Sequence, residues 1–208
     1  MAKTDARYVY VFAHGAGAGM NHPFMLRASA ALEARGIATQ RYEFPYMQAK
    51  KSRPDPPAVA EEAVREAVAE AARNYPGLPI LAGGKSFGGR MTSQAQASQP
   101  MPGVRGLVFF GFPLHAPGRP GTTRAEHLMS VDVPMLFLQG TRDEFAQLDL
   151  LQQVVKGLGD RATLHLIEEG DHSFKVPKRT GKTETDVMNE LADTFLQWVN
   201  AARVSLPR

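Results

Sequence analysis

The 208-residue chain contains no cysteine, and this absence removes three kinds of chemistry. Without thiols there is no disulfide framework, no thiolate metal site and no cysteine nucleophile. Long apolar runs are also missing, because no segment reaches the ~18 apolar residues of a membrane-spanning helix. The apolar run at 8–13 is too short for the core of a signal peptide. The sequence therefore predicts a cytoplasmic protein without a membrane partner.

The chain also lacks a large excess of charge of either sign. The chain has 24 Lys and Arg residues against 21 Asp and Glu residues, a net charge of +3. No dense basic run is interleaved with aromatic residues, so a nucleic-acid partner is not indicated. The histidines and carboxylates lack metal-ligand spacing, and we expect neither a metal nor a cofactor. The hydrophobic share of 43% is enough for a core, and the length suggests a single domain over residues 1–208.

Strand-like and helix-like segments alternate along the chain. The β-rich runs predict six strands, at 8–13, 38–44, 79–84, 105–112, 133–140 and 162–169. Apolar residues at helical spacing predict five helices, at 23–36, 58–73, 87–98, 146–157 and 184–203. The proline-rich segment 45–57 is expected to be a loop. This alternation is typical of an α/β fold, a parallel sheet with helices on both faces.

The segment GGKSFGGR, residues 83–90, permits two interpretations. It contains the Gly-Lys-Ser that ends a phosphate-binding P-loop, but such a loop needs a glycine five residues before Gly84. Pro79 occupies that position, and its fixed φ and missing N–H cannot replace the glycine. A dinucleotide fingerprint in HGAGAG (14–19) fails too, because Met20 and His22 stand where its third glycine would be.

The second interpretation is a nucleophile elbow, a sharp turn between a strand and a helix that presents a serine. Ser86 lies at such a turn between Gly84 and Gly88, where larger side chains would crowd it. The elbow predicts an acid and then a histidine further along the chain. Asp143 follows the fifth strand and His172 follows the sixth, both where active sites of open α/β sheets lie.

Each residue also has a plainer interpretation. Ser86 could be a helix N-cap, Asp143 a turn former and His172 an exposed loop residue; Glu144 is a weaker candidate for the acid. The chain order favours nucleophile, acid and base.

A strand order of 2-1-3-4-5-6 places the turns after the first and third strands side by side. We then expect an oxyanion hole from the N–H groups of Phe87 and Ala16, with Gly17 as the second choice after Ala16. His14 is expected to hold the first turn by hydrogen bonds, Lys85 to be a rim or structural residue, and Arg90 to pair with a carboxylate.

Together HGAG, GGKSFGGR, QGTRD and GDHSF resemble the α/β-hydrolase superfamily. They are most similar to its compact, lidless members, which are related to dienelactone hydrolase and to the testis-expressed and chromatin-complex hydrolase-like proteins of eukaryotes. The resemblance implies an α/β-hydrolase fold of about six mainly parallel strands with no cap domain. It implies a serine hydrolase that cleaves a small carboxylic ester or thioester through an acyl-enzyme intermediate.

This chain departs from the resemblance in its nucleophile, and the resemblance also leaves an alternative function. Dienelactone hydrolase itself uses a cysteine nucleophile, which this chain lacks. Some eukaryotic relatives are thought to serve in complexes, so the alternative is a non-catalytic binding or scaffold protein that retains the fold.

The substrate pocket is expected to be a shallow, open cleft, because the connection between the fourth and fifth strands is short and rich in Pro and Gly. Met47, Phe112 and Leu114 follow strand ends and are predicted as its apolar walls. The loops at that edge carry seven basic residues: Lys50, Lys51, Arg53, Lys175, Lys178, Arg179 and Lys182. They form either a basic rim that favours anionic acyl substrates or a set of solvated loop side chains. Nothing in the sequence indicates the oligomeric state.

Overall fold

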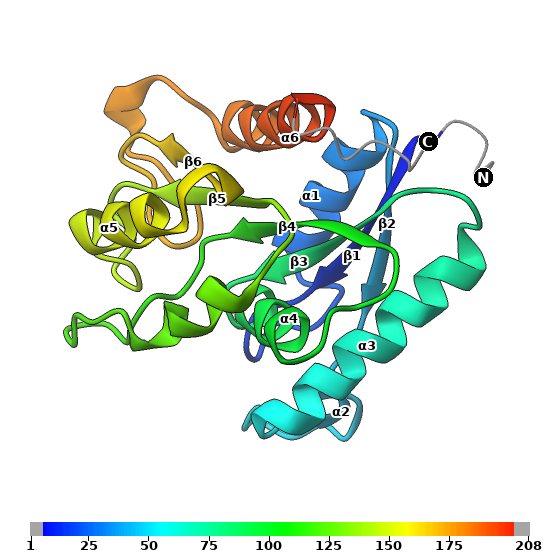
Figure 1. Cartoon of the computed structure of the whole chain (residues 1–208). Coiled ribbons are helices and arrows are strands. Elements are labelled where there is room, and N and C mark those ends of the chain that lie inside the picture. Colours follow the sequence, from blue (N-terminus) through cyan, green and yellow to red (C-terminus); the bar gives the residue numbers. More distant parts are fainter. Residues whose placement is uncertain (1–5, 202–208) are drawn as a thin grey trace.

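The computed structural model describes residues 6–201, which contain one six-stranded sheet (Figure 1). Its order is β2-β1-β3-β4-β5-β6, and every adjacent pair is parallel. The strands are β1 Tyr8–Ala13, β2 Ile37–Tyr42, β3 Ile80–Lys85, β4 Val104–Phe110, β5 Met135–Gly140 and β6 Ala162–Ile167. The predicted fold class and strand order are confirmed.

Within residues 6–201, six α-helices and three 3-10 helices lie between the strands or follow the last one. The α-helices are α1 Pro23–Glu33, α2 Pro45–Gln48, α3 Pro57–Asn74, α4 Phe87–Ser98, α5 Leu148–Leu158 and α6 Glu184–Ala201. The 3-10 helices are η1 Thr123–Ser130, η2 Gly159–Arg161 and η3 Lys178–Thr180. The end of the predicted helix 184–203, residues 202 and 203, lies outside the described residues.

Two elements differ from the prediction. The segment 45–57 was predicted as a loop, but it contains α2, because Pro45 at the first helical position supplies a φ suited to a helix start. The connection between β4 and β5 contains η1, which packs against α4.

The helices cover both faces of the sheet (Figure 1). On one face α1 and α6 pack together over a cluster rich in aromatic residues, in which the ring centroids of Tyr10 and Phe195 are 5.0 Å apart. Trp198 packs in this cluster and is 7% exposed, as expected of a core residue. On the other face α3, α4 and α5 cover a second apolar cluster. The sheet is therefore buried on both faces. Loops follow the carboxyl ends of its strands, and a site at that end is formed by loop residues.

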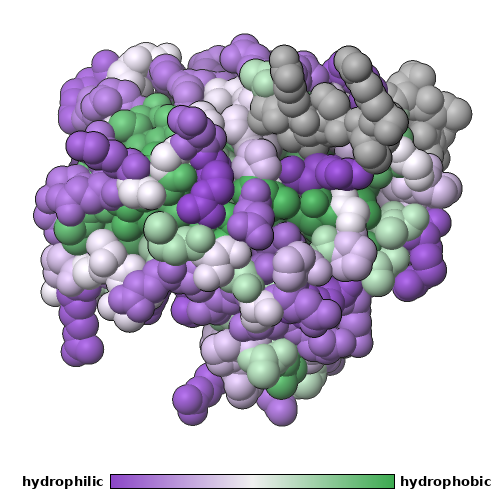
Figure 2. All heavy atoms as spheres, viewed as in Figure 1, coloured by the Kyte–Doolittle hydropathy of each residue, from purple (hydrophilic) through white to green (hydrophobic). Residues whose placement is uncertain are grey.

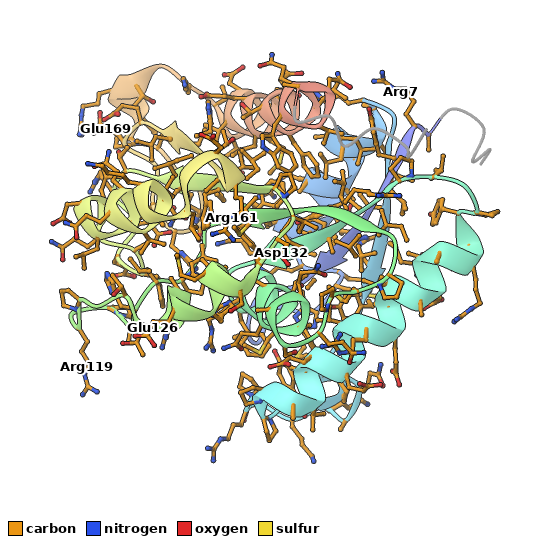
Figure 3. The ribbon with its side chains drawn as sticks, in the orientation of Figure 1. Arg7, Arg119, Glu126, Asp132, Arg161 and Glu169 are labelled. Atoms are coloured by element: carbon orange, nitrogen blue, oxygen red, sulfur yellow. The ribbon has the colours of Figure 1, made fainter. Side chains whose placement is uncertain are left out.

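The connection between β4 and β5 forms no cap over these loops within residues 6–201. Its tip is exposed, and Arg119 points away from the body of the molecule (Figure 3). His115 fixes its base, because its Nε2 accepts a hydrogen bond of 2.8 Å from the backbone N–H of Gln147.

Hydrophilic side chains predominate on the surface in the view of Figure 2, and hydrophobic side chains show between them across the middle of the molecule. Within the described residues, every helix is too short or too polar to cross a bilayer.

Candidate active site

Ser86 lies at a sharp turn between β3 and α4. Its backbone has φ 50° and ψ −116°, a conformation that non-glycine residues rarely adopt and that costs about 1–3 kcal/mol. The turn brings the serine to the carboxyl edge of the sheet, where it lines a cavity.

The flanking glycines of the turn are required by close packing against β1. A Cβ at Gly84 would lie 2.8 Å from Cβ of Ala13, and a Cβ at Gly88 would lie 2.7 Å from the same atom. Both distances are far inside van der Waals contact, and Ala13 is also the register partner of Gly84 in the sheet. The predicted steric need for glycine at both positions is therefore present in the fold. Its cause is the end of β1, because the atoms nearest to the added Cβ are the carbonyl oxygen of Ala13 at Gly84 and that of His14 at Gly88.

The structure brings Ser86, His172 and Asp143 together. The Nε2 atom of His172 lies 2.9 Å from Oγ of Ser86, and its Nδ1 atom lies 2.7 Å from Oδ2 of Asp143. His172 follows β6 and Asp143 follows β5, so three strand ends contribute one residue each. The geometry favours the imidazole tautomer in which Nδ1–H donates to Asp143 and Nε2 accepts from the serine hydroxyl.

Further contacts fix the carboxylate of Asp143, which is 4% exposed. Its Oδ1 accepts a hydrogen bond of 2.8 Å from the backbone N–H of Phe145, and its Oδ2 accepts one of 2.5 Å from the side-chain amide of Gln139. Gln139 is fully buried, and its Oε1 accepts the backbone N–H of Phe112 at 2.8 Å. Gln139 thus connects the end of β4 to the acid.

Sequence reasoning missed Gln139, although a signal was present. It is the single polar side chain in the otherwise apolar strand Met135–Gly140, and a buried polar group needs partners. It also missed Phe145, whose ring lies 4.3 Å from the ring of His172, and His22, which lines the cavity.

The loop that carries His172 is fixed by its own hydrogen bonds and by Lys85. The Oδ1 of Asp171 accepts the backbone N–H groups of Ser173 and Lys175, so this carboxylate binds the loop, whereas the one on the imidazole is that of Asp143. The Nζ atom of Lys85 donates a hydrogen bond of 2.6 Å to the carbonyl oxygen of His172. Burial lowers the pKa of Lys85 to about 8, although the charges of Asp143 and Asp171 oppose this shift.

The turn after β1 lies beside Ser86, as the strand order predicts. His14 is fully buried; its Nδ1 lies 2.8 Å from the carbonyl oxygen of Gly15, and its Nε2 accepts the backbone N–H of Phe44 at 3.2 Å. Burial lowers its pKa, although the carboxylate of Glu43, whose Oε2 lies 3.1 Å from Nε2, opposes this shift. The ring holds the turn by hydrogen bonds, as expected.

The backbone amides near Ser86 differ in what they bind. The N–H of Gly17 donates to the hydroxyl of Tyr46 at 2.8 Å and is therefore occupied. Within residues 6–201, the N–H groups of Ala16 and Phe87 have no hydrogen-bond acceptor. This difference favours Ala16 over Gly17 as a donor to a bound ligand.

A cavity of about 590 Å³ opens beside Ser86, between α1, the start of α6 and the loop after His172. Its apolar wall is formed by Phe24, Met25, Phe174, Val187 and Met188. The predicted wall residues do not line this cavity. Phe112 and Leu114 are 0% and 1% exposed in the core on the α4 face, and the partly buried Met47 packs against that core. The cavity lies on the α1–α6 face instead.

The predicted basic rim is also narrower than expected. Lys175 lines the cavity, whereas the other six residues of that set do not. Arg179 forms an ion pair with Glu169, a residue labelled in Figure 3, and Lys182 pairs with Glu190 at 2.6 Å. Arg90 has no carboxylate within ion-pair distance among the described residues, contrary to our expectation; burial and the charge of Arg124 lower its pKa.

A second serine–histidine pair lies on the far side of α4. The Oγ atom of Ser93 is 2.7 Å from Nε2 of His127, but Ser93 is fully buried and lines no part of the cavity. Among residues 6–201, no group of three His, Asp or Glu side chains is placed to hold a metal ion.

The chain is similar to a known protein family and to several solved structures. A family model described as an alpha/beta hydrolase domain matches residues 6–200. Dienelactone hydrolase from Anabaena variabilis is 18% identical with a TM-score of 0.73, and the match covers 96% of this chain and 88% of that one. A lidless α/β serine hydrolase from Xanthomonas campestris is 19% identical with a TM-score of 0.71, covering 98% and 87%. Est1E from Butyrivibrio proteoclasticus, with ferulic acid bound, is 14% identical with a TM-score of 0.71, covering 95% and 91%.

Proposed function

Because the chain belongs to the alpha/beta hydrolase family, we propose that it is a serine hydrolase that cleaves a small carboxylic ester or thioester through an acyl-enzyme intermediate. The observation that supports this proposal most is the continuous chain of contacts from Ser86 through His172 to Asp143, at 2.9 and 2.7 Å. The strained backbone at Ser86 is a second support, because such strain is typical of functional sites.

In the acylation step, Oγ of Ser86 attacks the carbonyl carbon of the substrate, while Nε2 of His172 takes the hydroxyl proton. Asp143 remains ionised and stabilises the imidazolium through its hydrogen bond to Nδ1. The tetrahedral intermediate then expels the alcohol or thiol, which receives the proton from Nε2. The acyl group stays on Ser86 as an ester.

In the deacylation step, Nε2 of His172 takes a proton from a water molecule, and the resulting hydroxide attacks the acyl carbon. The second tetrahedral intermediate collapses, Ser86 leaves and recovers its proton from the imidazolium, and the carboxylic acid is released. Water is the co-substrate, and no cofactor enters either step.

The negative oxygen of both intermediates is proposed to accept hydrogen bonds from the N–H groups of Ala16 and Phe87. Phe87 is the first residue of α4, so its N–H lies at the positive end of the helix dipole. Loss of one such donor typically lowers turnover by roughly 10²–10³.

Labelling with a fluorophosphonate probe tests the proposal. We expect the folded wild-type protein to be labelled once and Ser86→Ala to remain unlabelled. Ser93→Ala is the matched control, since Ser93 also contacts a histidine but is buried away from the cavity, and this variant keeps the label. A folded wild-type protein that takes no label would overturn the proposal and favour a binding or scaffold role. The hydrolysis of p-nitrophenyl esters by wild-type protein, Ser86→Ala and Ser93→Ala, each without prior exposure to the probe, then measures turnover.

A further inference from the structure

Lys85 lines the cavity next to Ser86, yet the proposed acyl transfer does not use its side chain. Its Nζ atom donates to the carbonyl oxygen of His172 at 2.6 Å. An ammonium group has three N–H donors. Among the described residues Nζ has no other hydrogen-bond acceptor, so two donors remain without a protein partner.

The surroundings of this ammonium group are aromatic. Nζ lies 5.8 Å from the ring centre of Phe24 and 5.5 Å from that of Phe174, and these two rings stack 5.9 Å apart. Aromatic faces attract a cation, but they do not accept strong hydrogen bonds. No carboxylate of residues 6–201 lies within 4.0 Å of Nζ, so its charge is not neutralised by an ion pair.

The other charged side chains of the wall do not supply the missing partner. Arg27 and Glu184 pair with each other at 3.5 Å, and both are more than half exposed. Lys175 is exposed to solvent and adds a second positive charge. Lys85 is therefore the inner cation of a cavity wall with a net positive charge. Its pKa of about 8 leaves it charged at neutral pH.

We infer that Lys85 selects the substrate, which is an ester or thioester whose acyl group carries a second, anionic group, a carboxylate. The carboxylate accepts hydrogen bonds from the free N–H groups of Lys85. An apolar acyl group of the same size would cover the ammonium and leave these donors unpaired. The anion is assigned to the acyl group because this part stays on Ser86 beside Lys85 after the first step, whereas the leaving group must exit to solvent. The inference rests on the proposed serine hydrolase function.

Paired substrates test this inference. The anionic series is the p-nitrophenyl monoesters of glutaric, adipic and pimelic acids. Each has a neutral counterpart in which an isopropyl group of similar shape replaces the distal carboxylate. The quantity measured is the ratio of kcat/KM for the anionic ester to that for its counterpart, after subtraction of spontaneous hydrolysis.

We expect this ratio to exceed one for wild-type protein at one or more chain lengths. Lys85→Met should lower it roughly ten- to hundredfold, the range expected for a hydrogen bond to a charged group. Lys175→Met is the matched control, and because Lys175 is exposed the ratio should change less than about fivefold.

This ratio distinguishes two roles of Lys85, selection of an anionic substrate and structural support of the loop that carries His172. If Lys85 only holds the loop of His172, Lys85→Met slows both esters equally and the ratio stays the same, which overturns the inference. A wild-type ratio below one at every chain length also overturns it, and this result does not depend on how the variant folds. If wild type hydrolyses neither series and takes no fluorophosphonate label, the proposed function itself has failed.

Discussion

The carboxylate of Asp143 owes its position to Gln139, a residue that touches neither Ser86 nor the cavity. The amide of Gln139 donates to Oδ2 of Asp143 and accepts the N–H of Phe112, so it fixes the acid relative to β4. An acid held from two sides keeps the imidazole of His172 in one tautomer and one orientation. Precision of this kind matters because a small misplacement of a catalytic group lowers rates strongly.

Replacing Gln139 with methionine tests this positioning role. Gln139→Met leaves the N–H of Phe112 unpaired in the core, which should lower the free energy of unfolding by about 1–3 kcal/mol. Because Asp143 also loses a donor, kcat should fall about ten- to hundredfold. Urea unfolding and ester hydrolysis measure the two effects.

Gln96→Met is the control for this experiment. Gln96 is 4% exposed on the buried face of α4, does not line the cavity, and accepts the backbone N–H of Met101 with its Oε1 at 3.0 Å. It should lose similar stability without a matching loss of kcat. Equal effects of the two variants on kcat would contradict the positioning role.

At the scale of elements, β1, β3 and α4 meet so closely that the elbow has no room for a side chain at its two glycines, Gly84 and Gly88. Gly84→Ala places a Cβ 2.8 Å from that of Ala13, and relief requires β1 or α4 to shift. We expect a loss of about 1–3 kcal/mol in the free energy of unfolding and a slower reaction with fluorophosphonate, because the shift moves Ser86. Denaturant titration and labelling rates measure the two changes.

Gly157→Ala provides the opposite case. Gly157 lies in α5, and an added Cβ would meet no atom within 4 Å. Alanine is the better helix former, so this variant should gain up to about 1 kcal/mol and label normally. A Gly84→Ala protein as stable as Gly157→Ala would disprove the steric role of Ala13.

The elements also show which parts of the fold the sequence could predict. Strands and long helices have strong periodicity, and the residues that follow strand ends, Ser86, Asp143 and His172, could be placed at one edge of the sheet by topology alone. The residues that form the wall of the cavity could not be predicted in this way, because they depend on which face of the sheet each helix covers. Phe112 and Leu114 follow β4 as predicted, but they turn into the core beneath α4 and η1, while the cavity opens beneath α1 and α6.

At the scale of the whole molecule, stability should depend on pH through His127. Its Nε2 lies 2.7 Å from Oγ of Ser93, and burial, reinforced by the charge of Arg90, lowers its pKa from 6.5 to about 4. Between these two values the unfolded chain binds a proton that the folded chain does not. The contribution of His127 is therefore complete above pH 6.5 and is lost as the pH falls toward 4.

His127→Phe isolates this effect. The wild-type protein should lose about 1–2 kcal/mol of unfolding free energy from this group between pH 6.5 and pH 4, a figure reduced for the partial exposure of the ring. In the His127→Phe variant, the unfolding free energy should lack this part of its dependence on pH. Denaturant unfolding at a series of pH values gives both curves, and parallel curves would refute the assignment.

Under the proposed mechanism, the separation of Ser86 and His172 along the chain also determines when the serine can become reactive during protein synthesis. The elbow and the turn carrying Ala16 are translated within the first half of the chain, but the base follows 86 residues after the nucleophile, beyond β6. A ribosome-bound chain that has already paired β1 with β3 therefore carries an inactive serine. Reactivity toward a fluorophosphonate would appear only when the last strand joins the sheet, which makes labelling a reporter of completed folding.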